Sequence, residues 1–397
     1  MTYIWALPAS LPGSLLARRS IKGLPGRSTG LARVVQSAAA GDELDSAARA
    51  ERLWRLAPAA VGVLALALGL IKLGSAPLTY DERVTIRSAA YSLGGIWNLA
   101  QHTEAPHAAY YVLIKPWLAA FGNSSWVARL PSVMFGALAA ATTTLLGMRL
   151  FDRLAGLAAG ILLATSTYFI GWSQQARGYV LAALLVTLAT YAFVRALECG
   201  DQRWWALWAV AGAGAAWANL FAASVLLAHV VAFLVARPRP PARIPLPAAG
   251  VVVVATTPIV VLVASNEKDQ LNWIPSLSWH WVRANVENWT RDNPLLLVAA
   301  ALGVVGLAGG AVAGSKPWKT TLLCAWVAAP FAVTLVLSAV QPAFLARYLV
   351  SAAPALALLA GAGVVSLRRW PGLLAAGPCS SSRESGSRIT ITRLARC

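Results

Sequence analysis

Between residues 56 and 367, long apolar stretches alternate with short polar segments. A helix needs about 20 mostly apolar residues to cross the hydrocarbon core of a bilayer. Ten stretches approach this length and are predicted to be membrane-spanning helices, at residues 56–73, 130–150, 154–170, 179–197, 204–218, 220–236, 244–264, 294–313, 320–340 and 348–367. The pattern therefore predicts an all-α polytopic membrane protein with about ten spans.

The apolar stretch at residues 107–121 is shorter and contains Lys115 and Pro116. If it crossed the membrane, every later loop would change sides. Lys and Arg are enriched in cytoplasmic loops. A helix that stays at the interface places eleven basic residues on the inner side: Arg149, Arg153, Arg195, Arg203, Arg237, Arg239, Arg243, Lys316, Lys319, Arg368 and Arg369. We therefore predict an interfacial helix at 107–121 and a cytoplasmic N-terminus, in a multi-pass protein of the cell (plasma) membrane.

The composition supports a membrane protein. Of the 397 residues, 58% are hydrophobic and only 12% charged, against roughly a quarter charged in soluble domains. The net charge of +18 would suggest nucleic acid on a soluble protein, but here cytoplasmic loops account for it. No nucleic-acid partner is predicted.

The two ends of the chain differ from its middle. Residues 1–50 are polar and rich in Gly, Ser and Arg, which predicts a disordered, basic cytoplasmic arm. Residues 51–370 form the predicted transmembrane domain. After Trp370 the composition changes abruptly to Ser, Arg and Thr, which predicts an irregular basic tail at 371–397. This tail is either aberrant, as after truncation or a change of reading frame, or a native cytoplasmic tail.

The predicted topology places seven of the 15 acidic residues on the outer side, where four segments are available for chemistry: 74–106, 171–178, 265–293 and 341–347. These acids are Asp81, Glu82, Glu104, Glu267, Asp269, Glu287 and Asp292. An amphipathic stretch at 84–99 separates the first pair from Glu104, so interfacial helices are predicted in the first outer loop. Ionisable residues at a membrane are costly to keep there and are therefore candidates for function.

Several short motifs occur in a fixed order along the chain. They are Asp81-Glu82, an acid–Pro–Tyr-Tyr segment from Glu104 to Tyr111, Arg129-Leu130-Pro131-Ser132, Gln174-Gln175-Ala176-Arg177-Gly178-Tyr179 and Arg347-Tyr348-Leu349. In this order they resemble the GT-C membrane glycosyltransferases, in particular the family 39-like group of protein O-mannosyltransferases and aminoarabinose transferases. The chain departs from that pattern at Gln175, where the family has an acid, at Gly178, where it has Pro, and around Glu104 and Pro106.

The resemblance implies a GT-C-like helix bundle and an enzyme that transfers a sugar, with inversion, from a polyprenyl phosphate. The sugar would be a hexose such as mannose, or a pentose, and the acceptor a lipid, glycan or protein on the outer face. Asp81 is the expected general base, since a carboxylate must take the acceptor proton. Glu82 would tune Asp81 or bind a cation. Arg177 and Arg347 are expected to bind the phosphate, because a guanidinium suits it.

Other residues complete the candidate site. The predicted substrate-binding residues are Glu104, His107, Tyr110, Arg177, Tyr179, Arg347 and Tyr348. Glu104, His102 and His107 either hold a divalent cation, the one cofactor considered, or are simply solvated. Arg129 is expected to anchor a helix end and Lys115 to reach the headgroups. The outer-loop tryptophans Trp273, Trp279, Trp281 and Trp289 either stack on sugars or form part of an interfacial belt.

Two other classes of function stay open. A transporter should carry ionisable groups in the middle of its spans. The predicted spans have almost none, with His229 as the main exception. A non-catalytic scaffold is the second alternative, and replacing Asp81 would then have no effect.

Overall fold

The computed structural model describes residues 28–266, 274–290, 294–309 and 316–375, and within these ranges every regular element is a helix. The elements are α1 (Ser28–Leu70), α2 (Tyr80–Ala90), α3 (Leu93–His102), η1 (Ala105–His107), α4 (Ala108–Phe121), α5 (Ser125–Leu150), α6 (Arg153–Ala164), α7 (Thr167–Ser173), α8 (Tyr179–Cys199), α9 (Gln202–Ala218), η2 (Leu220–Ser224), α10 (Val225–Val235), α11 (Leu246–Asn266), α12 (Trp279–Thr290), α13 (Pro294–Ala308), α14 (Pro317–Leu337), η3 (Ala346–Ala352) and α15 (Ala353–Ala375). The predicted all-α class is confirmed.

The chain divides into two units, Met1–Leu53 and Trp54–Cys397. In the first unit, the structure is helical from Ser28 onward. This differs from the prediction that residues 1–50 lack regular structure. Residues 28–50 are rich in Ala, which has the highest helix propensity, and an existing helix extends more easily than a new one starts. Residues 1–27 and 376–397, which include most of the predicted tail, lie outside the described residues.

Six described helices are long and apolar enough to cross a membrane: Ala48–Leu70, Ser125–Leu150, Tyr179–Cys199, Leu246–Ser265, Pro317–Leu337 and Ala346–Leu367. Arg153–Ala164 and Thr167–Ser173 make a seventh if the pair, bent by 60°, counts as one span. The other three predicted spans fall on α9, on η2 with α10, and on α13, which are shorter helices. The structure therefore gives a multi-pass membrane protein, with six or seven full-length spans among the residues it describes.

The helices of the second unit pack closely through small residues. Gly303 of α13 faces Leu359 of α15, and Gly363 of α15 faces Ala299 of α13. A Cβ atom on either glycine would collide with the backbone of the opposite helix. Such contacts let two helix backbones approach each other, which is a common way of packing helices in membranes.

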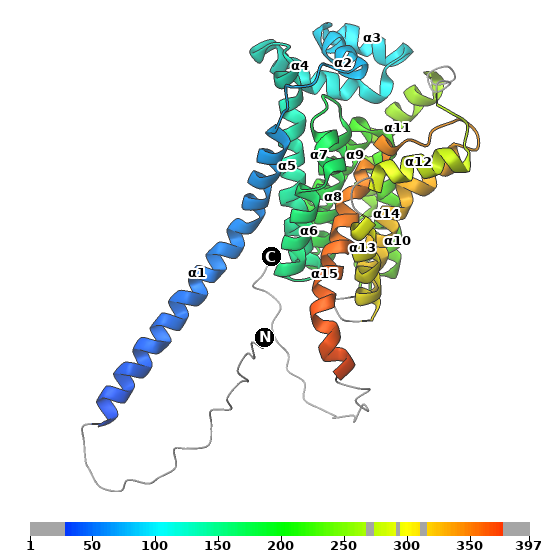
Figure 1. Ribbon diagram of the computed structural model, residues 1–397. Helices are drawn as coiled ribbons and strands as arrows, with labels where there is room; N and C mark the ends of the chain where they lie inside the picture. Colours follow the sequence, from blue (N-terminus) through cyan, green and yellow to red (C-terminus); the bar gives the residue numbers. More distant parts are fainter. Residues whose placement is uncertain (1–27, 267–273, 291–293, 310–315, 376–397) are drawn as a thin grey trace, which may run out of the picture. The chain divides into compact units, whose positions relative to one another are not determined.

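Short helices form a cap at one end of the bundle. Figure 1 shows α2, α3 and α4 together at the end where α5 begins. The predicted helix at 107–121 is present as α4, and at 14 residues it is too short for a normal span. It ends at Gly122, whose φ of +90° favours glycine. Buried residues of α2, α4 and α5 pack with Ala176, which joins the cap to the turn before α8.

Candidate active site

Asp81 lies in the first turn of α2, at the base of the cap. A capping box starts this helix: the side chain of Thr79 accepts from the Glu82 N–H, and Glu82 accepts from the Thr79 N–H. Asp81 Oδ1 lies 3.2 Å from Arg177 Nη2, and its Oδ2 lies 3.2 Å from Arg347 Nη1. The structure thus brings together Asp81, Arg177 and Arg347, which the sequence places in three separate outer segments.

Arg177 is held in the turn that precedes α8. The Gln174 side chain fixes this turn to the end of α1, donating to Gly69 O at 2.9 Å and Ile71 O at 2.8 Å. Arg177 Nη1 donates to the hydroxyl of Tyr111 at 3.2 Å. Its Nε is buried and has no hydrogen-bond partner among the described residues. One donor of this buried guanidinium therefore remains available to a ligand.

Arg347 is fixed through its neighbour Ala346, at the start of η3. The Ala346 N–H donates to Asn285 Oδ1 at 2.8 Å, and the Ala346 carbonyl accepts from the Tyr168 hydroxyl at 2.5 Å. Trp281 Nε1 donates to Phe344 O at 2.9 Å in the same segment. Because Trp281 and Asn285 belong to α12, that helix determines where Arg347 stands.

Glu82 is fully buried and paired with Arg129. Arg129 donates from Nε to Oε1 at 2.7 Å and from Nη2 to Oε2 at 2.8 Å. Glu82 also accepts from the backbone N–H groups of Thr79 and Ala176. Burial raises the pKa of this carboxyl, but the bonds from Arg129, Thr79 and Ala176 outweigh burial and hold the pKa below its usual value.

This environment does not fit the prediction from the sequence that Glu82 binds a cation. Its two oxygens already accept four hydrogen bonds, so the carboxylate is not arranged to bind a cation or a substrate. Arg129 also donates to the carbonyls of the connection before α2, at Leu73, Ala76 and Pro77. The pair therefore fixes the start of α2, and with it Asp81, and Arg129 anchors a helix end as predicted.

Glu104 meets the site through Tyr111. The Tyr111 hydroxyl donates to Glu104 Oε2 at 2.7 Å and accepts from Arg177 Nη1. Burial raises the pKa of Tyr111, and so does the adjacent Glu104, so this phenol keeps its proton. Tyr111 was not selected from the sequence. The available signal was its place in the acid–Pro–Tyr-Tyr segment, but Glu104 lies before α4, so no helical spacing pairs it with Tyr111.

His107 lies beside the two arginines. Its ring centroid is 6.4 Å from that of Tyr111 and 6.3 Å from that of Tyr179. Burial, and then the charges of Arg177 and Arg347, lower the pKa of His107 well below its usual value. Its imidazole is therefore neutral at physiological pH.

The predicted metal set does not come together. In the described ranges, no group of three His, Cys, Asp or Glu side chains is gathered to hold an ion. Glu104 is bound to Tyr111, and the exposed His102 forms a hydrogen bond between Nδ1 and Asn98 O at 2.8 Å. These three residues do not fit a divalent cation as a group.

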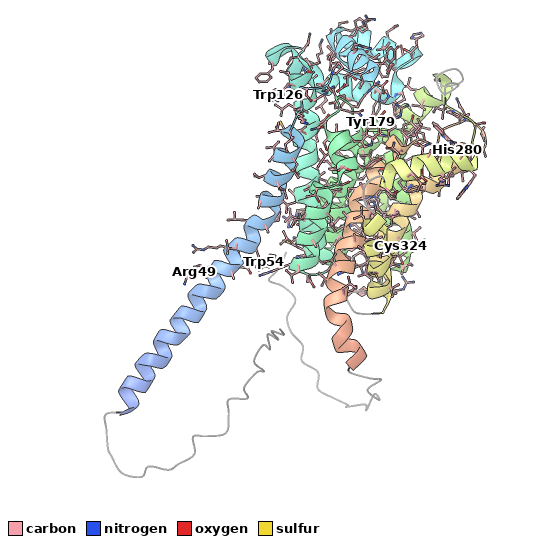
Figure 2. The ribbon with its side chains drawn as sticks, in the orientation of Figure 1. Arg49, Trp54, Trp126, Tyr179, His280 and Cys324 are labelled. Atoms are coloured by element: carbon pink, nitrogen blue, oxygen red, sulfur yellow. The ribbon has the colours of Figure 1, made fainter. Side chains whose placement is uncertain are left out.

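The predicted tyrosines have different surroundings. The Tyr110 hydroxyl is buried and bonds to Ser132 Oγ at 2.9 Å, so it packs the cap onto α5. Tyr179 packs edge-on against Trp172 near the end of the bundle that carries the cap helices, where Figure 2 labels it. Tyr348 stacks on Phe221 with ring centroids 4.2 Å apart. Tyr348 lies next to Arg347, whose guanidinium carbon is 5.5 Å from the centre of the Tyr348 ring.

Lys115 and three of the tryptophans from the predicted outer loops also have defined positions. Lys115 Nζ donates to Ala89 O at 3.1 Å and Tyr91 O at 2.7 Å, so it caps the end of α2. This differs from the prediction that Lys115 extends to the lipid headgroups. Trp289 is buried against Phe331, and Trp281 is bound to the backbone. Trp279 is 79% exposed and could contact a sugar or the interface. Trp273, Glu267, Asp269 and Asp292 lie outside the described residues.

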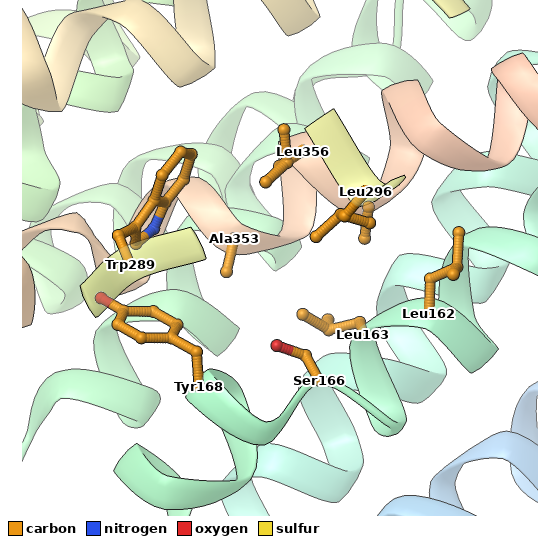
Figure 3. A pocket seen from close by; sticks show the side chains of 9 residues that line it. Leu162, Leu163, Ser166, Tyr168, Trp289, Leu296, Ala353 and Leu356 are labelled. Carbon is orange, nitrogen blue, oxygen red and sulfur yellow. The ribbon is translucent and has the colours of Figure 1, made fainter. Parts of the chain in front are cut away.

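An apolar crevice lies close to the Arg347 segment. Figure 3 shows its lining, which is Leu162, Leu163, Ser166, Tyr168, Trp289, Leu296, Ala353, Leu356 and Ala357. Its volume of about 20 Å³ holds about one water molecule and is far below that of an ordinary ligand pocket. The crevice separates Tyr168 from the leucines but is too small to hold a lipid in this structure.

His229, the titratable residue inside the predicted spans, is far from this chemistry. Trp208 Nε1 donates to its Nδ1 at 3.0 Å, so its Nε2 carries the proton toward Thr190 Oγ1, also at 3.0 Å. Both ring nitrogens are satisfied, and the residue joins α8, α9 and α10. It is a packing element of the bundle interior.

Comparison with known proteins adds to this geometry. Residues 104–264, less than half of the chain, match the family model of dolichyl-phosphate-mannose-protein mannosyltransferase. The match includes Glu104, Tyr111, Arg129 and Arg177, but not Asp81 or Arg347. No protein with a curated function matches the sequence.

Among solved structures, ArnT from Cupriavidus metallidurans bound to undecaprenyl phosphate is similar to 80% of this chain at 18% identity, with a TM-score of 0.57. The chain has a GT-C fold. The apo form of ArnT gives a TM-score of 0.57 at 19% identity and covers 82% of this chain. An oligosaccharyltransferase from Archaeoglobus fulgidus has a TM-score of 0.49 at 13% identity and covers 83% of this chain and 53% of its own.

This GT-C chain spans only part of the ArnT chains, 62% of the bound form and 63% of the apo form. The predicted relationship to the GT-C membrane glycosyltransferases is confirmed at the level of the fold. The GT-C bundle places Asp81 and its two arginines at the end that carries the cap helices.

Proposed function

We propose that this protein is an inverting glycosyltransferase that moves a sugar from a polyprenyl-phosphate donor to an acceptor on the outer face of the membrane. The observation that carries the proposal is the carboxylate of Asp81 held between two guanidinium groups at one end of a GT-C bundle. The same arrangement offers a base for the acceptor and cations for the phosphate of the donor.

The two arginines suit the phosphate. A guanidinium binds phosphate oxygens through planar, charge-assisted hydrogen bonds. Arg177 has a buried Nε without a described partner, which a phosphate oxygen would satisfy. Together with Asp81, the two arginines carry one net positive charge, which matches the single negative charge of a phosphodiester.

The exposed fractions of the three side chains indicate on which side of the site the donor and the acceptor bind. The Arg177 side chain is 5% exposed, that of Arg347 19% and that of Asp81 35%. The donor phosphate therefore lies on the buried side, against the arginines. The acceptor hydroxyl approaches from the exposed side, where Asp81 can reach it.

The reaction balances with these groups alone. The acceptor oxygen attacks the anomeric carbon from the face opposite to the phosphate, and the bond between that carbon and the phosphate oxygen breaks. The electron pair leaves with the phosphate, which Arg177 and Arg347 hold. The acceptor proton passes to Asp81. The divalent cation considered from the sequence enters no step, because the candidate ligands do not fit one.

In the structure, Asp81 itself occupies the position of the anion between the arginines. A bound phosphate competes for the same N–H groups and loosens the contacts that hold the carboxylate. Asp81 then has lone pairs free to accept a proton. Donor binding therefore precedes base catalysis, and an acceptor that arrives first meets a carboxylate engaged in two ion pairs.

Two comparisons support the choice of donor. The family model that matches residues 104–264 describes mannosyl transfer from a dolichyl phosphate, and the ArnT structure contains undecaprenyl phosphate. Mannose or another hexose is the sugar that the first supports, and a pentose is the alternative. The proposed acceptor is a lipid, glycan or protein. The enzyme itself lies in the cell membrane with its N-terminus on the cytoplasmic side.

The proposal is tested by purifying the full chain into nanodiscs and analysing bound lipids by mass spectrometry. Polyprenyl-phosphate hexoses and pentoses are then screened as donors by measuring release of polyprenyl phosphate. Bound polyprenyl phosphate together with turnover of one donor supports the enzyme. A preparation that neither binds such lipids nor turns over any donor contradicts it and favours the scaffold.

A further inference from the structure

The hydroxyl of Tyr111 joins two charged groups of the site. It accepts a hydrogen bond from Arg177 Nη1 at 3.2 Å and donates one to Glu104 Oε2 at 2.7 Å. A phenol oxygen has one proton and two lone pairs. Since Glu104 takes the proton, a lone pair is left facing Arg177, and the short bond to a carboxylate strengthens the oxygen as an acceptor.

The ring of Tyr111 is fixed independently of this hydroxyl. The residue is completely buried, in a small cluster with Ile96 and Ala100 of α3 and Ala108 of α4. The cap helices therefore determine where the ring lies. Loss of the hydroxyl alone leaves this packing intact.

Arg177 has few other side-chain contacts to hold it. Nη2 binds Asp81, and Nε has no described partner. In the proposed reaction, the contact with Asp81 is the one that changes, because the donor phosphate competes for the guanidinium and Asp81 then takes up a proton. A second, unchanging contact is needed to keep the guanidinium oriented through the cycle.

From this geometry we infer that Tyr111, supported by Glu104, is a positioning residue that keeps the Arg177 guanidinium directed at the donor phosphate. The inference rests on the proposed function and adds two residues that do not touch the reacting atoms. Glu104 then acts through Tyr111 and not as a ligand of the sugar. The cap thus contributes to donor binding through one hydroxyl group.

The test measures binding of a short-chain polyprenyl monophosphate to the purified full chain, and donor KM and kcat in the transfer assay. Tyr111→Phe is expected to weaken binding about tenfold, which corresponds to one hydrogen bond to a charged group. KM for the donor should rise by a similar factor, while kcat at saturating donor changes little. A residue that only stabilises the fold would not produce this division between KM and kcat.

Three further variants separate positioning from stability. Thr190→Val removes another buried hydroxyl, the one bound to His229, and should lower thermal stability without affecting donor binding. Glu104→Gln keeps an oxygen that can accept from Tyr111, so it should bind donor better than Glu104→Ala does. The Glu104 pair also carries the test if Tyr111→Phe fails to fold.

Two results overturn the inference, and they differ from failure of the proposed function. If the wild-type chain binds the monophosphate and Tyr111→Phe binds it equally well, Tyr111 is only a packing residue. Equal binding by Glu104→Gln and Glu104→Ala would show that Glu104 does not help to position Arg177 through Tyr111. If the wild-type chain does not bind the monophosphate at all, the proposed function is wrong and the inference falls with it.

Discussion

At Glu82, burial and hydrogen bonding act on one carboxylate in opposite directions. Burial disfavours its charge, but Arg129 and two backbone N–H groups stabilise it, and the pKa ends below the usual value of 4.5. A group with a lowered pKa contributes stability that is complete above its unfolded pKa and is lost as the pH falls through its folded pKa. The Glu82–Arg129 pair should therefore make the cap sensitive to acid.

The first prediction is that Glu82→Gln destabilises the protein at neutral pH. Breaking a buried ion pair by removing one charge costs roughly 3–5 kcal/mol. We expect a lower thermal unfolding midpoint at pH 7, and a difference from wild type that shrinks as the pH falls below about 4.5. Thermal unfolding in detergent from pH 3 to 8 measures it. A difference that stays constant over this range would show that the ionised carboxylate is not what stabilises the cap.

The sequence indicated the proposed reacting groups better than the residues that hold these groups in position. Asp81, Arg177 and Arg347 were identifiable because each belongs to a short motif of a predicted outer segment, and the order of these motifs resembles the GT-C pattern. The hydrogen bonds from the Tyr168 hydroxyl to the Ala346 carbonyl and from the Ala346 N–H to Asn285 connect segments 178 and 61 positions apart, and no periodicity marks such pairs. Glu82 was grouped with Asp81 as a catalytic residue because the sequence does not show which of two adjacent acids is buried.

At the level of elements, α12 positions the segment that carries Arg347. Its Asn285 accepts from the N–H of Ala346, and the same side chain donates to Trp281 O in its own helix at 3.0 Å. Asn285 is buried, so losing it leaves the Ala346 N–H without this partner. A change on α12 should therefore reach the phosphate site through the backbone.

The second prediction is that Asn285→Ala weakens binding of a polyprenyl monophosphate about tenfold, since Arg347 is no longer held in place. Glu287→Gln on the same helix is the matched control, because the Glu287 side chain is exposed and pairs with Arg283, one turn earlier on α12, at 2.6 Å. Binding to purified variants measures the effect. Equal affinities in Asn285→Ala and wild type would show that α12 does not set the position of Arg347.

The predicted boundary between the spans at 204–218 and 220–236 coincides with the break at Asn219, whose side chain accepts from the Phe221 N–H. What the apolar pattern did not show is that the second stretch begins with a 3₁₀ segment, η2, so α10 is only 11 residues long and α9 only 17, both shorter than a normal span. Conversely, α4 was correctly expected as a short helix because Lys115 and Pro116 interrupt its apolar run.

For the whole molecule, the sidedness of the loops stays a prediction. It rests on the basic residues at 237–243, where Arg237 and Arg239 donate to carbonyls at the end of α10. If this linker is cytoplasmic, α12 and the cap lie on the outer side with the candidate site.

The third prediction tests this sidedness in whole cells. In a background without the native cysteines, a membrane-impermeant thiol reagent should label a His280→Cys variant and leave a Pro240→Cys variant unlabelled. His280 is exposed on α12, so it serves as the outer-side control. Labelling at position 240 without permeabilisation would reverse the topology and move the site to the cytoplasm.

The most direct test of the whole account is one pair of measurements on Asp81→Asn. If Asp81 is the base and also competes for the arginines, this variant should bind a polyprenyl monophosphate at least as tightly as wild type. Transfer should fall by about 10²–10⁴-fold, the usual contribution of general-base catalysis. Full transfer activity in Asp81→Asn, or a loss of phosphate binding, would contradict the roles assigned to Asp81, Arg177 and Arg347.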